Sequence, residues 1–178
     1  VGIDDYDSAP LSCCVNDAKE LAAALQMDEY GFSTRTLLNE AASRKTIIRE
    51  LETCRLQKPT TFLFYFSGHG CTTITGTYLV THDGEPLDEG IELGVLSRIL
   101  ANFSSNDTTT VVILDCCHSG SASPWIPDIK PMIRSDVERG IPAIGKGRII
   151  LAACRPEQYS YEDTASGHGL FTNILLNG

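Results

Sequence analysis

A histidine and a cysteine each follow an apolar segment of this sequence, and together they could form a nucleophile and base pair. His69 comes three residues after the run at 61–66, and Cys117 comes three residues after the run at 109–114. A cysteine becomes a nucleophile when a neighbour takes its proton or stabilises its thiolate, and an imidazole that titrates near neutrality is the usual partner. The pair would perform acyl transfer if the fold brought its members together.

The apolar segments before His69 and Cys117 are predicted to be strands, as is a third run at 148–154. Uninterrupted apolar runs are expected where helices cover both faces of a parallel sheet. Helical spacing of apolar residues is found between these runs, at 17–27, 43–54 and 91–100. This alternation predicts an α/β fold with a mainly parallel central sheet sandwiched between helices. The carboxyl ends of such strands meet at one rim, so His69 and Cys117 should lie together.

The length and the ends of the chain indicate one domain. The sequence has 178 residues, residues 2–4 look like the end of a first strand, and residues 170–176 look like the start of a helix. We therefore expect a single domain, 1–178, truncated at both ends. Residues 119–146 are rich in Pro, Gly and Ser without sustained periodicity, and we interpret them as a long surface connection.

Composition and charge are those of a soluble globular protein, with 42% apolar and 21% charged residues. The net charge of −9 and the lack of a Lys or Arg run argue against nucleic acid and favour a basic peptide as partner. The seven cysteines include two adjacent pairs, which favours reduced thiols and a cytoplasmic setting over a disulfide framework. Neither a membrane span nor a signal peptide is visible, and no membrane partner is expected.

Each chemical motif also has a simpler interpretation. Gly-His-Gly is more often a turn with a solvated histidine, and Cys-Cys-His is more often two buried thiols beside a surface histidine. A zinc site normally uses four ligands with a Cys-x-x-Cys spacing, and the adjacent Cys116 and Cys117 cannot easily bind one ion. A cysteine-dependent hydrolase or redox protein is a further alternative, weakened in its redox form by the lack of Cys-x-x-Cys.

The two motifs in combination resemble a known family. Tyr-Phe-Ser-Gly-His69-Gly, followed 48 residues after His69 by Asp-Cys-Cys117-His-Ser-Gly, closely resembles the metacaspase branch of the caspase-like cysteine peptidases. The resemblance implies a large-subunit-like region at 1–121, a linker at 122–147 and a small-subunit-like region at 148–178.

The resemblance also implies roles at the reacting centre. Cys117 rather than Cys116 is the expected nucleophile, and His69 rather than His118 is the expected base. The backbone N–H groups of Gly70 and Cys117 are expected to hold the oxyanion. The reaction would proceed through an acyl-enzyme that water hydrolyses.

Substrate choice is expected to follow from carboxylates at the same rim. The resemblance implies that Cys14, Asp17, Ser67 and Asp115 line the pocket for the residue before the scissile bond. Two carboxylates in a partly desolvated pocket select a cation, so we expect cleavage after Arg or Lys. Asp17 could equally be a first-turn helix residue and Asp115 a strand terminator, and these roles are compatible with the pocket.

Other properties are expected from the resemblance and the acids. Many metacaspases need calcium, but the stretch after Cys117 has no acid until Asp128, so calcium dependence is doubtful and no cofactor or metal site is expected. We expect a monomer or a part of a larger multidomain chain, acting on protein or peptide substrates. Programmed cell death is a role that the resemblance suggests. The alternative function is a catalytically silent caspase-like scaffold domain.

Overall fold

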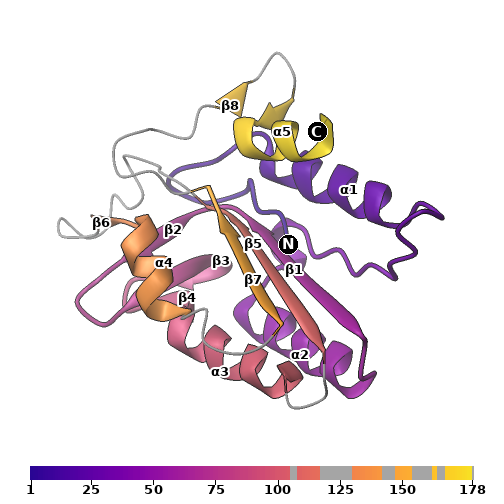
Figure 1. Cartoon of the computed structure of the whole chain (residues 1–178). Helices are drawn as coiled ribbons and strands as arrows, with labels where there is room; N and C mark the ends of the chain where they lie inside the picture. Colours follow the sequence, from indigo (N-terminus) through magenta and orange to yellow (C-terminus); the bar gives the residue numbers. More distant parts are fainter. Residues whose placement is uncertain (105–107, 117–129, 142–146, 154–161, 164–166, 178) are drawn as a thin grey trace.

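The computed structural model describes residues 1–104, 108–116, 130–141, 147–153, 162–163 and 167–177 (Figure 1). Its helices are α1 (Cys14–Leu25), α2 (Arg44–Leu56), α3 (Leu93–Ser104), α4 (Arg134–Gly140) and α5 (Leu170–Asn177), with a 3-10 turn at Asn39–Ala41. Its strands are β1 (Thr61–Ser67), β2 (Gly70–Thr72), β3 (Thr77–Glu85), β4 (Asp88–Glu92), β5 (Thr109–Asp115), β6 (Lys130–Pro131), β7 (Arg148–Ala152), β8 (Glu162–Asp163) and β9 (His168–Gly169).

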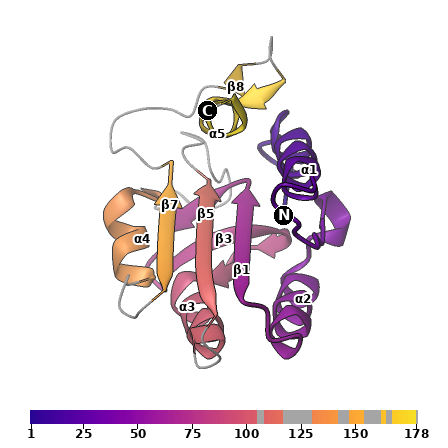
Figure 2. The ribbon, with the colours of Figure 1, turned by 45° about the vertical axis from the view of Figure 1, so that its right-hand side comes forward.

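The three predicted strands form one parallel sheet in the order β1-β5-β7, which confirms the predicted α/β class (Figure 2). Alternate residues of β1 and β5 face opposite helical layers, as the two-residue period of a strand requires. Phe64 and Val112 belong to the core that α2, α3 and α4 cover, whereas Tyr65 and Ile113 pack with residues of α1 and α5. The central sheet is therefore sandwiched between helices, as expected.

The start of the chain lies along the free edge of β1. The Val1 carbonyl accepts a hydrogen bond from the Ser67 N–H at 3.0 Å, and the Ile3 N–H donates to the Ser67 carbonyl at 3.1 Å. On the other side the Gly2 N–H donates to the Leu37 carbonyl at 3.0 Å. The chain at residues 2–4 therefore starts with an extended segment that is hydrogen-bonded along β1, in agreement with the expectation of a strand end there.

A second, antiparallel sheet in the order β4-β3-β2-β6 was not predicted from the sequence. Its longest strand, β3, carries charged and polar residues at its carboxyl end, so that an apolar strand pattern is missing there. The helix expected at 91–100 begins only at Leu93, because Ile91 is paired with Leu79 in this sheet. The sheet matters for function because β2 begins at Gly70, directly after His69.

The interpretation of 119–146 as a surface connection was wrong for residues 130–141. Strand β6 and helix α4 lie within this segment, and Met132, Val137 and Ile141 are buried in the main core. The Asp136 carboxylate accepts the Ile133 N–H at 3.0 Å and the Thr72 hydroxyl at 3.1 Å, which begins α4 and fastens it to β2. A helix of seven residues is too short to show a clear apolar period in the sequence.

The hairpin of β8 and β9 lies beside α1 and leads directly into α5. Within the described parts of the chain, no helix combines the length and the apolar character needed to cross a bilayer.

Candidate active site

The two motifs leave the parallel sheet at neighbouring positions. Ser67 and Asp115 are register partners at the ends of β1 and β5, and the Gly68 N–H donates to the Asp115 carbonyl at 3.3 Å. His69 follows two residues after Ser67, and Cys116 is buried directly after Asp115. The predicted nucleophile Cys117 and its neighbour His118 lie outside the described residues, so the predicted Cys117 and His69 pair stays a prediction.

His69 is held in one orientation by the chain before α1. Its ring is 4% exposed, and Nε2 lies 2.6 Å from the carbonyl oxygen of Ala9. Because a carbonyl only accepts hydrogen bonds, Nε2 must carry the proton of this contact. In the neutral ring Nδ1 is then the nitrogen that can accept a proton, which is the state required of a general base.

Tyr6 fixes the backbone of His69. Its hydroxyl accepts the His69 N–H at 3.1 Å and donates to the Val80 carbonyl at 3.0 Å. The Tyr6 and His69 rings are also in contact, with centroids 4.4 Å apart. Burial raises the pKa of Tyr6 well above its ordinary value, so the hydroxyl stays protonated and can donate.

Gly70 brings the histidine segment against the chain that leads to Cys117. A Cβ atom at Gly70 would lie 3.0 Å from the carbonyl oxygen of Cys116 and 2.8 Å from Cε of Met132. Only glycine permits this close approach. The peptide before Cys117 therefore lies against the residue that the sequence analysis assigned to the oxyanion site.

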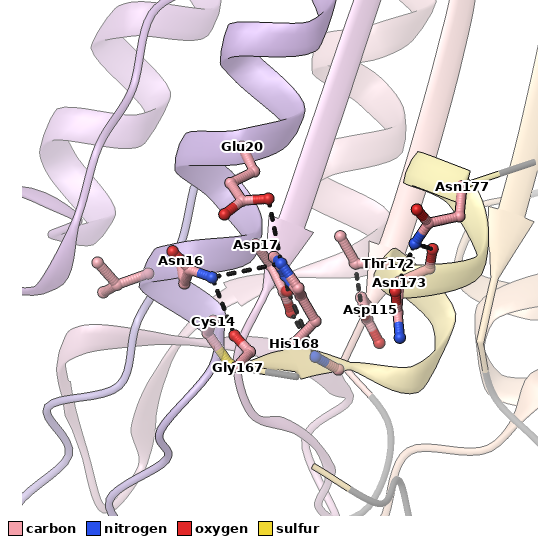
Figure 3. Close-up of polar contacts among 12 residues, drawn as sticks. Cys14, Asn16, Asp17, Glu20, Asp115, Gly167, His168, Thr172, Asn173 and Asn177 are labelled. Atoms are coloured by element: carbon pink, nitrogen blue, oxygen red, sulfur yellow. Dashed lines mark hydrogen bonds and ion pairs between the residues drawn. The ribbon is translucent and has the colours of Figure 1, made fainter. Parts of the chain in front are cut away.

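The two predicted pocket carboxylates approach the same residue, Gly169 of β9. A Cβ atom at Gly169 would lie 3.0 Å from Oδ2 of Asp17 and 3.2 Å from Oδ2 of Asp115. Asp17 comes from the first turn of α1 and Asp115 from the end of β5, as Figure 3 shows. The structure thus brings these two acids together. Asp17 is also a first-turn residue of α1 and Asp115 also ends β5, so the simpler interpretations of both positions apply as well.

Asp17 is enclosed by β9. Its Oδ1 lies 2.7 Å from Nδ1 of His168, and the Gly169 N–H donates to Oδ2 at 3.1 Å (Figure 3). Burial raises the pKa of Asp17, although the hydrogen bonds from His168 and Gly169 act in the opposite direction. The carboxylate is 1% exposed, so its charge acts within the protein rather than in solvent.

Asp115 ends a chain of hydroxyl groups. The Thr172 hydroxyl of α5 donates to Oδ2 of Asp115 at 2.7 Å, and the Tyr65 hydroxyl lies 2.6 Å from the Thr172 oxygen. Thr172 gives its one proton to Asp115, so Tyr65 must be the donor to Thr172. Both partners are neutral, so they orient the Asp115 carboxylate without adding a compensating charge.

Cys14 and Ser67 complete the predicted pocket set and share a side-chain hydrogen bond. Both side chains are buried. Burial raises the pKa of the Cys14 thiol well above its ordinary value, so this thiol stays protonated and is a poor nucleophile. Cys71 is similar, since burial raises the pKa of its thiol to about 12.

Helix α1 begins at Cys14, three residues before the predicted start, because a distant acid caps it. The Asp4 carboxylate accepts the N–H groups of Cys14 at 2.8 Å and Val15 at 3.1 Å. The sequence offers no local cap at Cys13, so this boundary depends on the tertiary fold. The cap fixes the turn that carries both Cys14 and Asp17.

Four residues of the site were not identified from the sequence: Tyr6, Ala9, His168 and Thr172. Residues 167–169 were predicted to precede the helix at 170–176 within the small-subunit-like region, and their one available signal for a site was a histidine between two glycines. Ala9 acts through a backbone carbonyl, so its residue type carries no signal. The contacts of Tyr6 and Thr172 span 63 and 57 residues and depend on topology.

Two of the acidic residues after His69 have structural partners. The Asp83 carboxylate accepts the backbone N–H of Arg44 at 2.8 Å, and Glu92 accepts the Gly94 N–H at 3.2 Å. Burial acts to raise the pKa of Asp83, but the hydrogen bond from Arg44 acts to lower it, and the pKa of Asp83 lies below its ordinary value overall. Among the described residues, no group of three or more His, Cys, Asp or Glu side chains is arranged to hold a metal ion.

The sheet, its helical layers and the strand-end motifs define a caspase-like α/β fold. The model of the caspase domain, peptidase family C14, matches residues 1–178. The chain is 30% identical over 195 aligned positions to metacaspase-3 of Trypanosoma cruzi (strain CL Brener), covering 90% of this chain and 52% of that protein. It is 27% identical over 112 positions to a paracaspase of Dictyostelium discoideum, covering 63% of this chain and 25% of that protein.

The chain belongs to the caspase-domain family of cysteine peptidases, as a metacaspase-like member. It spans about half the length of the metacaspase and a quarter of the paracaspase.

Proposed function

We propose that this domain is a cysteine endopeptidase that cleaves after Arg or Lys, with Cys117 as nucleophile and His69 as base. The observation that carries the proposal is the register of Ser67 with Asp115, from which both motifs leave the sheet side by side. Membership of a peptidase family supports the reaction class.

In the first step, Nδ1 of His69 takes the proton of the Cys117 thiol, and the thiolate attacks the substrate carbonyl carbon. The tetrahedral oxyanion accepts hydrogen bonds from the backbone N–H groups of Gly70 and Cys117. His69 then gives the proton to the leaving amine, and the C–N bond breaks to give an acyl-enzyme. Water, deprotonated by His69, hydrolyses the thioester and restores the thiol.

The proposed role of Ala9 is to orient the base. Its carbonyl accepts the proton of Nε2 at 2.6 Å, so the imidazole can gain a proton at Nδ1 while Nε2 stays protonated. The imidazolium that forms is also favoured by this contact, because a carbonyl dipole stabilises a neighbouring positive charge. The described contact that assists the base is therefore a backbone carbonyl.

The preference for Arg or Lys is proposed from the two acids at Gly169. Asp17 and Asp115 are 1% and 6% exposed, so they act in a partly desolvated setting where a cationic side chain gains more than it would in water. An acidic side chain would be repelled there. Ser67 and Cys14 lie beside these acids and would form the neutral part of the wall.

The proposal is tested with short peptide amide reporters that end in Arg, Lys or Asp. We expect turnover of the Arg and Lys reporters, and a loss of about a thousandfold or more in kcat/KM for Cys117→Ala and His69→Ala. Cys116→Ser and His118→Asn, at the residues on either side of Cys117, are the matched control variants and should still turn over the Arg and Lys reporters. If no reporter is cleaved in a Cys117-dependent way, the domain is instead a silent scaffold. Equal cleavage after Asp would refute the proposed basic preference.

A further inference from the structure

The buried side chain of helix α5 is a polar one. Every residue of α5 is described, and Thr172 is the only one of them that is buried. Leu170 and Ile174 of the same helix are 53% and 64% exposed. A helix that served only to cover the sheet would turn its apolar side chains inward and its polar ones outward. The position of Thr172 therefore requires a reason other than apolar packing.

The Thr172 hydroxyl lies between two buried groups. It donates to Oδ2 of Asp115 at 2.7 Å, as Figure 3 shows, and its oxygen lies 2.6 Å from the Tyr65 hydroxyl. Because a carboxylate only accepts hydrogen bonds, the single proton of Thr172 goes to Asp115, and Tyr65 is the donor to Thr172. The contact with Tyr65 thus fixes the rotation of the Thr172 hydroxyl so that its proton points at Asp115.

One short segment gives a hydrogen bond to each acid of the predicted pocket. The Gly169 N–H donates to Oδ2 of Asp17 at 3.1 Å, and Thr172 follows three residues later with its bond to Asp115. A Cβ atom at Gly169 would lie 3.0 Å from the Asp17 oxygen and 3.2 Å from the Asp115 oxygen, so both carboxylates face the same point.

The two carboxylates repel each other, and the donors at residues 169–172 oppose that repulsion. Like charges interact more strongly in a partly desolvated site than in water. Without the Thr172 hydroxyl, the Asp115 carboxylate would have one donor fewer, and repulsion from Asp17 would turn it away from Gly169. Asp17 would keep the hydrogen bond from the Gly169 N–H.

We propose that Thr172 is a positioning residue of the basic-residue pocket, which acts through Asp115. Its hydroxyl keeps the Asp115 carboxylate beside that of Asp17, and the two acids together select Arg or Lys. This inference rests on the proposed function for the identity of the pocket, but it concerns binding of the substrate side chain rather than bond cleavage.

The test is peptide binding to the Cys117→Ala protein, which lacks the proposed nucleophile. A short peptide amide that ends in Arg is compared with one that ends in citrulline, the neutral isostere of Arg, and isothermal titration gives both dissociation constants. Thr172→Val nearly keeps the shape of the side chain and removes the hydroxyl. We expect the Arg peptide to bind about ten- to thirtyfold more weakly, as for the loss of a hydrogen bond to a charged group. The citrulline peptide carries no charge for the acids to attract and should bind as it does to the parent.

Kinetics give a second measurement in the protein that retains Cys117. Thr172→Val should raise KM for the Arg reporter and change kcat less, because the hydroxyl acts on binding of the side chain before the scissile bond.

Further variants separate positioning from a structural role. Thr172→Ser keeps the hydroxyl and should keep the parental affinity for the Arg peptide. Thr172→Cys carries a weak donor, should give an intermediate loss, and serves as the test if the valine variant does not fold. Thr108→Val is the matched control, because Thr108 is 2% exposed and donates to the Pro59 carbonyl at 2.6 Å, before the start of β5. It should lose stability and bind the Arg peptide as the parent does.

The outcomes are distinguishable. Parental binding of the Arg peptide by Thr172→Val, or equal weakening of both peptides, overturns the inference and leaves the proposed peptidase intact. A parent protein that does not prefer the Arg peptide to the citrulline peptide overturns the inference together with the basic pocket. An Arg preference that depends on the Thr172 hydroxyl, without Cys117-dependent cleavage of reporters, supports the inference and refutes the proposed catalysis.

Discussion

Ser67 and Asp115 are directly paired at the carboxyl ends of β1 and β5, the two neighbouring parallel strands. His69 and Cys117 each follow two residues after one member of this pair. A slip of one residue between the strands would turn one of the two motifs toward the other face of the sheet. The register of β1 and β5 therefore supports the proposed pairing of His69 with Cys117 more directly than any single contact does.

Tyr6→Phe removes the hydroxyl that accepts the His69 N–H and donates to Val80, and it keeps the ring beside His69. We expect kcat to fall about ten- to a hundredfold, because a small displacement of the base is costly. The free energy of unfolding should fall by about 1–3 kcal/mol, since two buried groups lose a partner. Reporter kinetics and urea unfolding measure the two effects.

Tyr78→Phe is the control for this change. The Tyr78 hydroxyl donates to Thr75 at 3.0 Å in an exposed contact, so neither kcat nor stability should change noticeably. Wild-type kcat in Tyr6→Phe would show that Tyr6 does not position the base.

Gly169→Ala would place a methyl group between the two carboxylates, 3.0 Å from Asp17 and 3.2 Å from Asp115. Because both acids are buried, we expect them to separate at a cost of about 1–3 kcal/mol in stability, with a higher KM for the Arg reporter. Gly94→Ala is the control, since the three atoms nearest to its Cβ would all belong to the Glu92 side chain, which can move. An unchanged KM in Gly169→Ala would mean that these acids do not contact the substrate side chain.

The buried Asp17 should leave a signature in stability against pH. Burial raises the pKa of Asp17 above its ordinary value of 3.8, so the folded state binds this proton more tightly than the unfolded state. The stabilisation is complete below the ordinary pKa and is lost as pH rises through the raised pKa. We expect wild type to lose stability relative to Asp17→Asn as pH rises from about 3 to 6.

Urea unfolding at several pH values measures this difference. Asp7→Asn, at an exposed acid, should show no such trend. If wild type instead gains stability relative to Asp17→Asn with rising pH, the contact with His168 outweighs burial and the direction assigned to Asp17 is wrong.

Removal of metal should leave the peptidase active. The acid Asp83 is engaged by the backbone of Arg44, and Glu89 is 5% exposed in the antiparallel sheet. We therefore expect kcat/KM for the Arg reporter to be the same with a calcium chelator as with added calcium. A strict need for calcium would show that acids of this chain form a cation site.

The sequence predicted the parallel strands and the amphipathic helices well, because long apolar runs and helical periods are local signals. It could not predict the antiparallel sheet, because its longest strand, β3, ends in charged and polar residues. It also could not predict α4, a seven-residue helix whose flanking residues Met132 and Ile141 are buried in the core. Within the site, Asp17 and Asp115 were identified from the resemblance. The partners of these acids, His168 and Thr172, lie 151 and 57 residues away and depend on the tertiary fold.

The most direct test of the proposed dyad is to map a covalent label among the seven cysteines. An Arg-terminated peptide carrying a thiol-reactive ketone is incubated with the native protein, and the labelled residue is identified by mass spectrometry. We expect one label, on Cys117, formed far more slowly in His69→Ala and not with an Asp-terminated reagent. Labelling of Cys116 or Cys14 instead, or a rate on Cys117 that does not depend on His69, would contradict the proposed mechanism.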